Sequence, residues 1–353
     1  MTPAIDAIIR PLDAVRREFW RLSARTEFGR RCLREPAYRL QYLALGHVAS
    51  SLVLTLVAPM WLLLLGPLLL GIPHVASDIR YFVLKPPFVI RSRFIFVAPL
   101  LVMVAVRALS WAGLPWTPLL EISLGFGTAA ALLLLVPLTV PRRLAALAVL
   151  GAVWVGVSPS AYTFLLVFAH GHNLVAALVW FWLFAKEARP SRVAVVALGY
   201  FAAGALIMSG IFDGFWSNDM AVGGFSIETM VFVMAPGFDF ETGIRLVMLF
   251  AFAQSFHYAI WLRLVPQSLD PRPAPPTFAR AFRRLRDDFG GLGLASLVGV
   301  ALAVPALALL WDAEGARNAY LITVVFHGWL ELAVLAALLA GAGAFRPSRG
   351  RGA

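Results

Sequence analysis

The chain of 353 residues contains a single cysteine, Cys32, and few charged side chains. One thiol excludes an intramolecular disulfide and any metal site built from several cysteines. Charged residues make up only 14% of the chain, against about 25% in an average soluble protein. Hydrophobic residues make up 60%, and the mean hydropathy is +0.81. This composition excludes a soluble globular fold and a disordered chain, and it indicates an integral membrane protein with many spans.

The basic residues are unevenly distributed along the chain. A net charge of +11 would suit a nucleic-acid-binding protein. However, Lys and Arg stand in short clusters between apolar runs, which is typical of cytoplasmic loops that face anionic lipid. We therefore expect membrane lipid around the chain and no nucleic acid as a partner, and no feature of the sequence points to a protein partner.

The N-terminal segment, residues 1–40, holds nine arginines and no continuous apolar run, so no cleavable signal peptide is expected. Its apolar residues recur at helical spacing, with Leu12, Val15 and Phe19 alternating with Arg16 and Arg17. This pattern predicts one or two amphipathic helices on the membrane surface, with a solvated cytosolic tail as the alternative.

Ten apolar segments are each long enough, or nearly so, to span a bilayer. We therefore predict an all-α, polytopic membrane protein of about ten transmembrane helices, with residues 41–343 as one transmembrane domain and residues 344–353 as a cytosolic tail. Residues 221–236 are a weaker apolar stretch, interpreted as re-entrant or interfacial, and residues 264–289 are interpreted as a loop. The predicted spans are 41–59, 61–83, 94–113, 118–140, 144–158, 161–185, 193–212, 243–262, 290–311 and 318–343.

The charges predict the orientation of these spans. With the N-terminus in the cytosol, 27 of the 30 Lys and Arg fall in or beside cytosolic segments, and only Arg107, Arg245 and Arg317 do not. The long outer loop, residues 213–242, carries five acidic residues and no basic one. We expect an even number of spans, with both termini on the cytosolic side of the plasma or cell inner membrane.

All six histidines fall inside predicted spans. Ionisable side chains are costly in the bilayer, so they usually face the interior of the helix bundle and serve function. The distribution predicts a shared metal or cofactor site, and a proton or substrate pathway or scattered hydrogen bonds remain as alternatives. The candidate metal ligands are His47, His74, His170, His172, His257 and His327.

Two carboxylates accompany these histidines. His74 and Asp78 are four residues apart, as are His327 and Glu331, so each pair shares a helix face. Asp78 and Glu331 are therefore candidate catalytic residues, acting as metal ligands or as acceptors that orient an imidazole. An alternative for Asp78 is an ion pair with Arg80 at the membrane edge.

The segment that contains His170 and His172 poses a geometric problem. Residues i and i+2 of a straight helix point about 200° apart. Both rings can reach one centre only if Gly171 lets the helix deform, as in a π-bulge. Otherwise one ring binds and the other faces a second cavity or a neighbouring helix. We expect both near the site, and His170 is preferred as the ligand.

The donor set limits the choice of metal. Imidazoles with nearby carboxylates and no thiolate suit iron, copper or zinc, and Fe(II) is our first choice. Haem bound by two facing histidines remains open. A site buried among apolar helices suits a substrate that is itself dissolved in the bilayer.

The segment Gly71-Ile72-Pro73-His74-Val75-Ala76-Ser77-Asp78 resembles a known motif. It is similar to the GxPHGAxD motif of the Brp/Blh family, multi-span bacterial and archaeal membrane oxygenases. Members of that family cleave β-carotene to two retinals with O₂ and a non-haem iron held by histidines. The resemblance implies His74 as an iron ligand with Asp78 as its neighbour. Val75 departs from the pattern, because the family usually has glycine there.

We therefore expect a membrane-embedded non-haem iron oxygenase that acts on a long apolar substrate, a carotenoid by resemblance. A transporter of metal ions or protons is the alternative from another class, because intramembrane His, Asp and Glu also mark ion pathways. A haem-binding electron-transfer protein is the third hypothesis.

Overall fold

The structure is a computed structural model, and it describes residues 3–86, 88–90, 92–217, 220–222, 224–310 and 312–342. These residues are almost entirely helical, which confirms the predicted all-α fold. The predicted tail, residues 344–353, lies outside the described residues. The first half of the chain forms α1 (Pro3–Ser23), α2 (Glu27–Arg34), α3 (Pro36–Val57), α4 (Pro59–Leu65), η1 (Gly66–Leu70), α5 (Gly71–Asp78), η2 (Ile79–Leu84), α6 (Arg93–Trp111), α7 (Thr117–Leu135), α8 (Val140–Val157) and η3 (Ser158–Ser160).

The described residues of the second half are again mainly helical, with one short antiparallel ribbon between η4 and α11, in which Ala221 pairs with Ser226. It forms α9 (Ala161–Glu187), α10 (Pro190–Met208), η4 (Asp213–Phe215), β1 (Ala221–Val222), β2 (Phe225–Ser226), α11 (Ile227–Met234), α12 (Phe240–Ala259), η5 (Ile260–Leu264), α13 (Val265–Leu269), α14 (Phe278–Leu310), α15 (Ala313–Thr323) and α16 (Phe326–Leu339).

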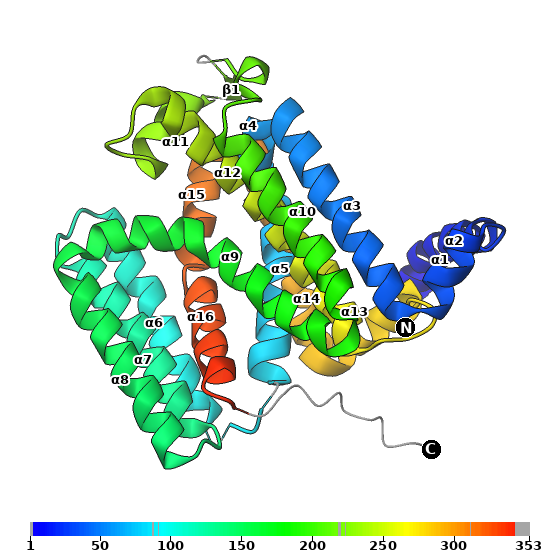
Figure 1. Ribbon diagram of the computed structural model, residues 1–353, viewed down its shortest axis with the longest axis horizontal. Coiled ribbons are helices and arrows are strands. Elements are labelled where there is room, and N and C mark those ends of the chain that lie inside the picture. Colours follow the sequence, from blue (N-terminus) through cyan, green and yellow to red (C-terminus); the bar gives the residue numbers. More distant parts are fainter. Residues whose placement is uncertain are drawn as a thin grey trace.

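Eight helices among the described residues are long and apolar enough to cross a membrane, so the predicted count of ten is not confirmed. Two differences account for the gap. Residues Val140–Glu187 form one continuous helical run of 48 residues where two spans were predicted, although the chain turns sharply between α8 and α9 (Figure 1). The apolar part of α6, Val97–Ser110, is shorter than a full span.

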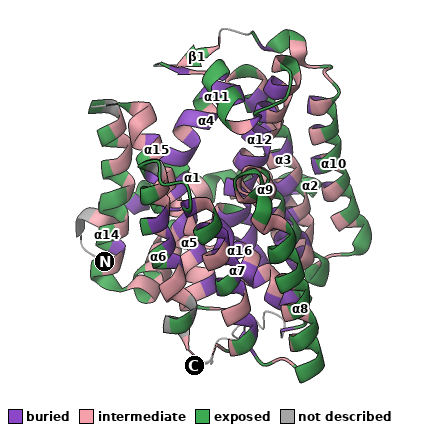
Figure 2. Cartoon of the chain, turned by 90° about the vertical axis from the view of Figure 1, so that its left-hand side faces the viewer, coloured by how far each residue is buried: buried purple, intermediate pink, exposed green. Residues whose placement is uncertain are grey.

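Helix α12 lies at the centre of the bundle and contacts α3, α9, α10 and α11. A second group, α6, α7 and α16, packs beside it, and α9 contacts both α12 and α16. Exposed residues cover the outer helices α8, α10 and α14, whereas buried residues gather on α12 and α16 (Figure 2). This arrangement brings segments that are distant in sequence together at the middle of the molecule.

In the part of the chain that the structure describes, three π-helical segments interrupt the helices that lead to this centre. Segments η1 and η2 flank α5, and η5 directly follows α12. Pro67 lies within η1 and Pro266 just after η5, and proline lacks the amide hydrogen that a regular α-helical turn needs. The widened turns therefore lie beside His74 and His257. The π-bulge suggested at Gly171 is not found, because α9 is α-helical throughout.

Two further segments were predicted from the sequence, the N-terminal residues and residues 264–289. The N-terminal residues form two helices, α1 and α2, as the amphipathic pattern predicts. The loop predicted over residues 264–289 is wrong: α13 occupies Val265–Leu269, and α14 begins at Phe278. Gly290, with φ of +74°, bends α14, so an amphipathic arm precedes its apolar stretch.

The predicted outer loop lies at one end of the molecule. In Figure 1, α13 and the end of α16 lie toward the lower end of the molecule, α1 and α2 project at its side, and α11 and β1 lie at the upper end. Residues 221–236, expected as a re-entrant or interfacial helix, form the ribbon and the eight-residue helix α11, which packs on α12. Orientation relative to the cytosol stays a prediction.

Candidate metal centre

Four imidazole rings from four helices form a closed ring of contacts. His74 comes from α5, His172 from α9, His257 from α12 and His327 from the first turn of α16. The ring centroid of His74 lies 4.6 Å from that of His257 and 5.0 Å from that of His327. The centroid of His172 lies 5.2 Å and 5.3 Å from the same two rings. The structure thus brings four of the six predicted ligands together.

The ring nitrogens converge as well as the rings. Nε2 of His74 lies 3.0 Å from Nε2 of His257. One nitrogen from each of His74, His257 and His327 falls within 4.8 Å of the others. Two imidazole nitrogens at such a distance must share either a proton or a cation. Because metal–imidazole bonds are about 2.0–2.1 Å long, both nitrogens can bind a single ion.

Two buried carboxylates complete the cluster. Oδ2 of Asp78 lies 3.5 Å from Nε2 of His74, and Oε1 of Glu331 lies 3.5 Å from Nε2 of His257. Both side chains are fully buried, no hydrogen bond of good geometry reaches their four oxygens from the described residues, and only the indole of Trp261 lies beside Glu331 as a neutral donor. Burying an ionised carboxylate is very costly unless a cation balances it. The fit of the donor set to a divalent metal is therefore good.

The position of the carboxylates separates two predicted roles. An orienting acceptor would contact Nδ1 of the imidazole and leave Nε2 for the metal. Here Nδ1 of both His74 and His257 has no hydrogen-bond partner among the described residues, and the carboxylates face Nε2 instead. This geometry favours Asp78 and Glu331 as metal ligands. The ion pair of Asp78 with Arg80 is not found, since Arg80 binds Asp288 at 2.6 Å.

The other two rings of the cluster are oriented by their own helices. Nδ1 of His172 donates to the carbonyl oxygen of Ala169 at 2.8 Å, and Nδ1 of His327 donates to that of Val324. With Nδ1 as the donor, the neutral ring presents the lone pair of Nε2, which is the tautomer that a metal ligand needs. The pairing of Glu331 with His327, expected from their spacing, is replaced by its contact with His257.

His170 and His47 lie outside the cluster. Nε2 of His170 lies 3.0 Å from the carbonyl oxygen of Met234. Because α9 is not deformed at Gly171, only one of its two histidines can face the centre, and it is His172. The preference for His170 is therefore corrected. His47 is half-buried on α3, and its charged neighbour is Arg263 rather than another histidine.

A cavity of about 400 Å³ adjoins the cluster. All four clustered histidines and His170 line it, together with aromatic and aliphatic side chains. Phe168 and Trp329 form part of its wall, with ring centroids 4.4 Å apart. Tyr162 and Val233, which are exposed, also line the cavity, so it reaches the apolar surface near α9 and α11. Its volume lies within the range of small-molecule sites, about 300–1,000 Å³.

The sequence analysis missed the polar residues of this cavity. Arg107 donates two hydrogen bonds to Glu121, and both line the cavity. Arg317 is buried there and donates from Nε to the carbonyl oxygen of Leu63 at 2.9 Å. Arg107 and Arg317 were two of the three exceptions to the charge asymmetry. A charged residue inside an apolar span is itself a signal of a lined cavity.

Close packing at Gly71 supports the helix that carries His74. A Cβ atom at this position would lie 2.1 Å from the hydroxyl oxygen of Tyr320. The absence of a side chain at Gly71 therefore leaves room for the ring of Tyr320 against α5. Val75, the departure from the family motif, packs with Tyr320 and Val324.

The arrangement can bind a divalent metal with imidazole and carboxylate donors beside an apolar chamber. Such a donor set suits iron, zinc or copper. Comparisons of the chain with protein-family models, with curated proteins and with solved structures found no match, so the assignment of this centre rests on its own geometry.

Proposed function

We propose that this protein is a membrane-embedded non-haem iron oxygenase that acts on a long apolar substrate, a carotenoid such as β-carotene by its resemblance to the Brp/Blh family. The observation that carries the proposal is the position of the histidine cluster at the wall of a mainly apolar cavity. A metal that only stabilised the fold would need no such chamber. The His74 and Asp78 pair lies in the segment that carries the resemblance.

The roles of the residues follow from their contacts. His74, His257 and His327 would hold the metal, with the ring of His172 beside them, and Asp78 and Glu331 would balance its charge. When bound, Fe(II) supplies the activation of O₂. Adding both oxygen atoms across one C=C bond yields two carbonyl groups, so the reaction needs no further reductant.

The cavity supplies orientation and a dry environment. Phe168 and Trp329 line the cavity, and Phe164 stacks on Phe168. Flat aromatic surfaces suit a conjugated polyene. Its opening beside Tyr162 and Val233 lets an apolar molecule enter from the bilayer. The charges of Arg107 and Glu121 neutralise one another, so they add little cost for an apolar occupant.

The crowding of the four rings argues against haem. Neighbouring ring centroids lie only 4.6–5.3 Å apart. Such close rings suit a single ion better than a flat macrocycle. An absorption spectrum of the purified protein checks this point, since haem would give a Soret band.

The test is co-expression with a β-carotene pathway in aerated cells. We expect the orange cells to bleach and to accumulate retinal, in a manner that needs O₂ and iron. His74→Ala should stay orange, and His47→Ala, a matched intramembrane histidine outside the cluster, should bleach. Bleaching without retinal would support an oxygenase with another cleavage position. Unchanged colour with folded, iron-loaded protein would refute carotenoid cleavage.

A further inference from the structure

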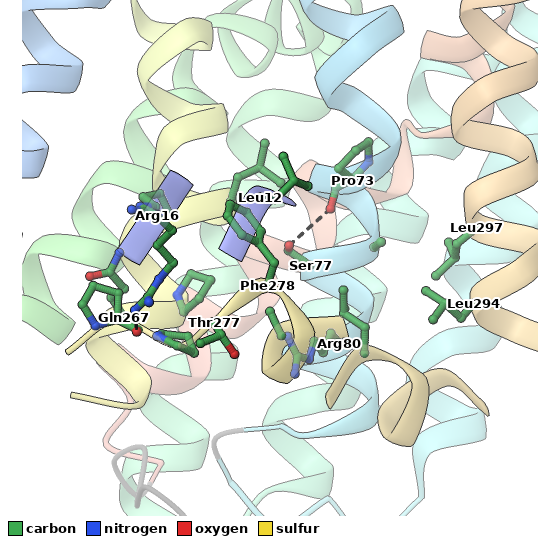
Figure 3. Close-up of a pocket in the computed structure, with 18 of the residues that line it drawn as sticks. Leu12, Arg16, Pro73, Ser77, Arg80, Gln267, Thr277, Phe278, Leu294 and Leu297 are labelled. Atoms are coloured by element: carbon green, nitrogen blue, oxygen red, sulfur yellow. Dashed lines mark hydrogen bonds between the residues drawn. The ribbon is translucent and has the colours of Figure 1, made fainter. Parts of the chain in front are cut away.

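A second cavity, of about 740 Å³, lies on the other face of α5 from the histidine cluster. Pro73, Ala76 and Ser77 line it, whereas His74 and Asp78 point to the metal centre. Helix α1 forms one wall with Leu12, and α14 forms another with Leu294 and Leu297 (Figure 3). The walls are mainly apolar, and the volume lies within the range of ligand sites.

The mouth of this cavity carries cations that no carboxylate of the described residues neutralises. Arg16 and Arg263 line it; Arg16 donates to the carbonyl oxygen of Pro275, and the charged neighbour of Arg263 is Arg16. Arg39, also near Arg263, is buried and donates only to neutral acceptors, among them Gln267 at 3.1 Å. Arg39 therefore adds positive charge behind the cavity, whereas Arg16 and Arg263, which line it, are the groups that can contact an anion.

The acidic residues nearby are already engaged. Asp13 accepts hydrogen bonds from the backbone amides at the start of α14, at 2.6 Å from Phe278 and 3.2 Å from Ala279. Asp288 is paired with Arg80 and Lys85. The electrostatic balance at the mouth is thus positive, while the interior is apolar.

We propose that this cavity binds an anionic phospholipid. Arg16 and Arg263 bind the phosphate of the headgroup, and an acyl chain lies in the apolar slot between α5 and α14. A basic pocket between helices at the end of a membrane span is the arrangement that binds anionic headgroups. Val15 and Phe19 of α1 are 71% and 59% exposed, which suits a helix that itself lies against lipid.

The experiment measures lipid binding to the purified full-length protein by native mass spectrometry in a neutral detergent. The probes are dioleoylphosphatidylglycerol and dioleoylphosphatidylcholine at equal concentration. We expect a one-to-one adduct with the phosphatidylglycerol that is retained much better than the phosphatidylcholine adduct. Arg16→Gln and Arg263→Gln should each weaken it about fivefold, the contribution of one basic residue near a lipid surface.

Two further variants separate the site from general surface charge. Arg17→Gln removes the same charge from the exposed neighbour of Arg16 and should leave binding unchanged. Ala301→Phe keeps every cation but fills the slot from α14, and it should abolish the adduct. Elution as a single symmetric peak in size-exclusion chromatography shows that each variant is folded.

Four outcomes would overturn the proposal. Equal retention of the two lipids would show no selection of the anion. An equal loss of the phosphatidylglycerol adduct in Arg16→Gln and Arg17→Gln would show that the lipid responds only to the general surface charge. Displacement of the lipid by an equal concentration of glycerol phosphate, or full binding by Ala301→Phe, would show a headgroup or free-phosphate site without an acyl slot.

Discussion

At the residue scale, the six histidines divide into four that contact one another and two that do not. The four in the cluster are His74, His172, His257 and His327, and the buried carboxylates of Asp78 and Glu331 lie beside them. We predict that His74→Ala or His257→Ala strips the metal from the purified protein. Loss of an orienting group typically costs 10–100-fold in metal affinity, and loss of a ligand should cost at least as much. Metal content is measured by elemental analysis.

The matched controls are the two histidines outside the cluster. His47→Ala and His170→Ala also remove an imidazole from an apolar helix, but they should retain the metal. Full occupancy in both His74→Ala and His257→Ala would disprove the shared centre. Asp78→Asn tests the carboxylate in the same measurement of metal content, because an amide keeps the shape of the side chain and removes its charge.

At the element scale, Glu35 joins the start of α3 to α2 and to the start of α10. Its carboxylate accepts from Arg192 at 3.0 Å and from Arg31 at 2.9 Å. Those hydrogen bonds, with Arg192 as the larger cause, hold the pKa of Glu35 below its ordinary value of 4.5. The ionised form is thus favoured in the folded protein. Its contribution to stability is complete above pH 4.5 and is lost as the pH falls through the folded pKa.

The prediction concerns the melting temperature. Glu35→Gln should melt below the wild type at neutral pH, and the difference should vanish in acid as Glu35 becomes protonated. The effect should be small, because both partners are partly exposed. In an Arg192→Gln background, Glu35→Gln should lower the melting temperature by less than it does in the wild type. A double-mutant cycle measures this difference. A difference that grows as the pH falls would contradict this coupling.

At the scale of the whole molecule, the basic connections that follow α9 and α13 lie away from the acidic loop, whose β1 and α11 form the opposite end (Figure 1). The positive-inside rule then predicts both termini in the cytosol and the β1–β2 ribbon outside. Reporter fusions at residue 225 and at the C-terminus should therefore report opposite sides. The prediction depends only on an odd number of crossings between these points. The same side for both would disprove the orientation.

The composition and the helical periodicity were enough to predict the class of fold and much of the local geometry. Apolar runs predict membrane helices because the bilayer leaves no other partner for backbone amides. The spacing of His74 and Asp78 predicts their contact because residues four apart share a helix face. Both inferences use interactions within one segment of the chain, which the order of residues describes directly.

The convergence of the site could not be predicted in this way. That His172 rather than His170 faces the centre, and that Glu331 contacts His257 rather than His327, depends on how each helix is rotated against its neighbours. Those rotations come from packing between helices far apart in the sequence, such as α9 with α12 and α16. Gly290 illustrates the same limit, because its bend folds the start of α14 beside α1 and so closes the second cavity.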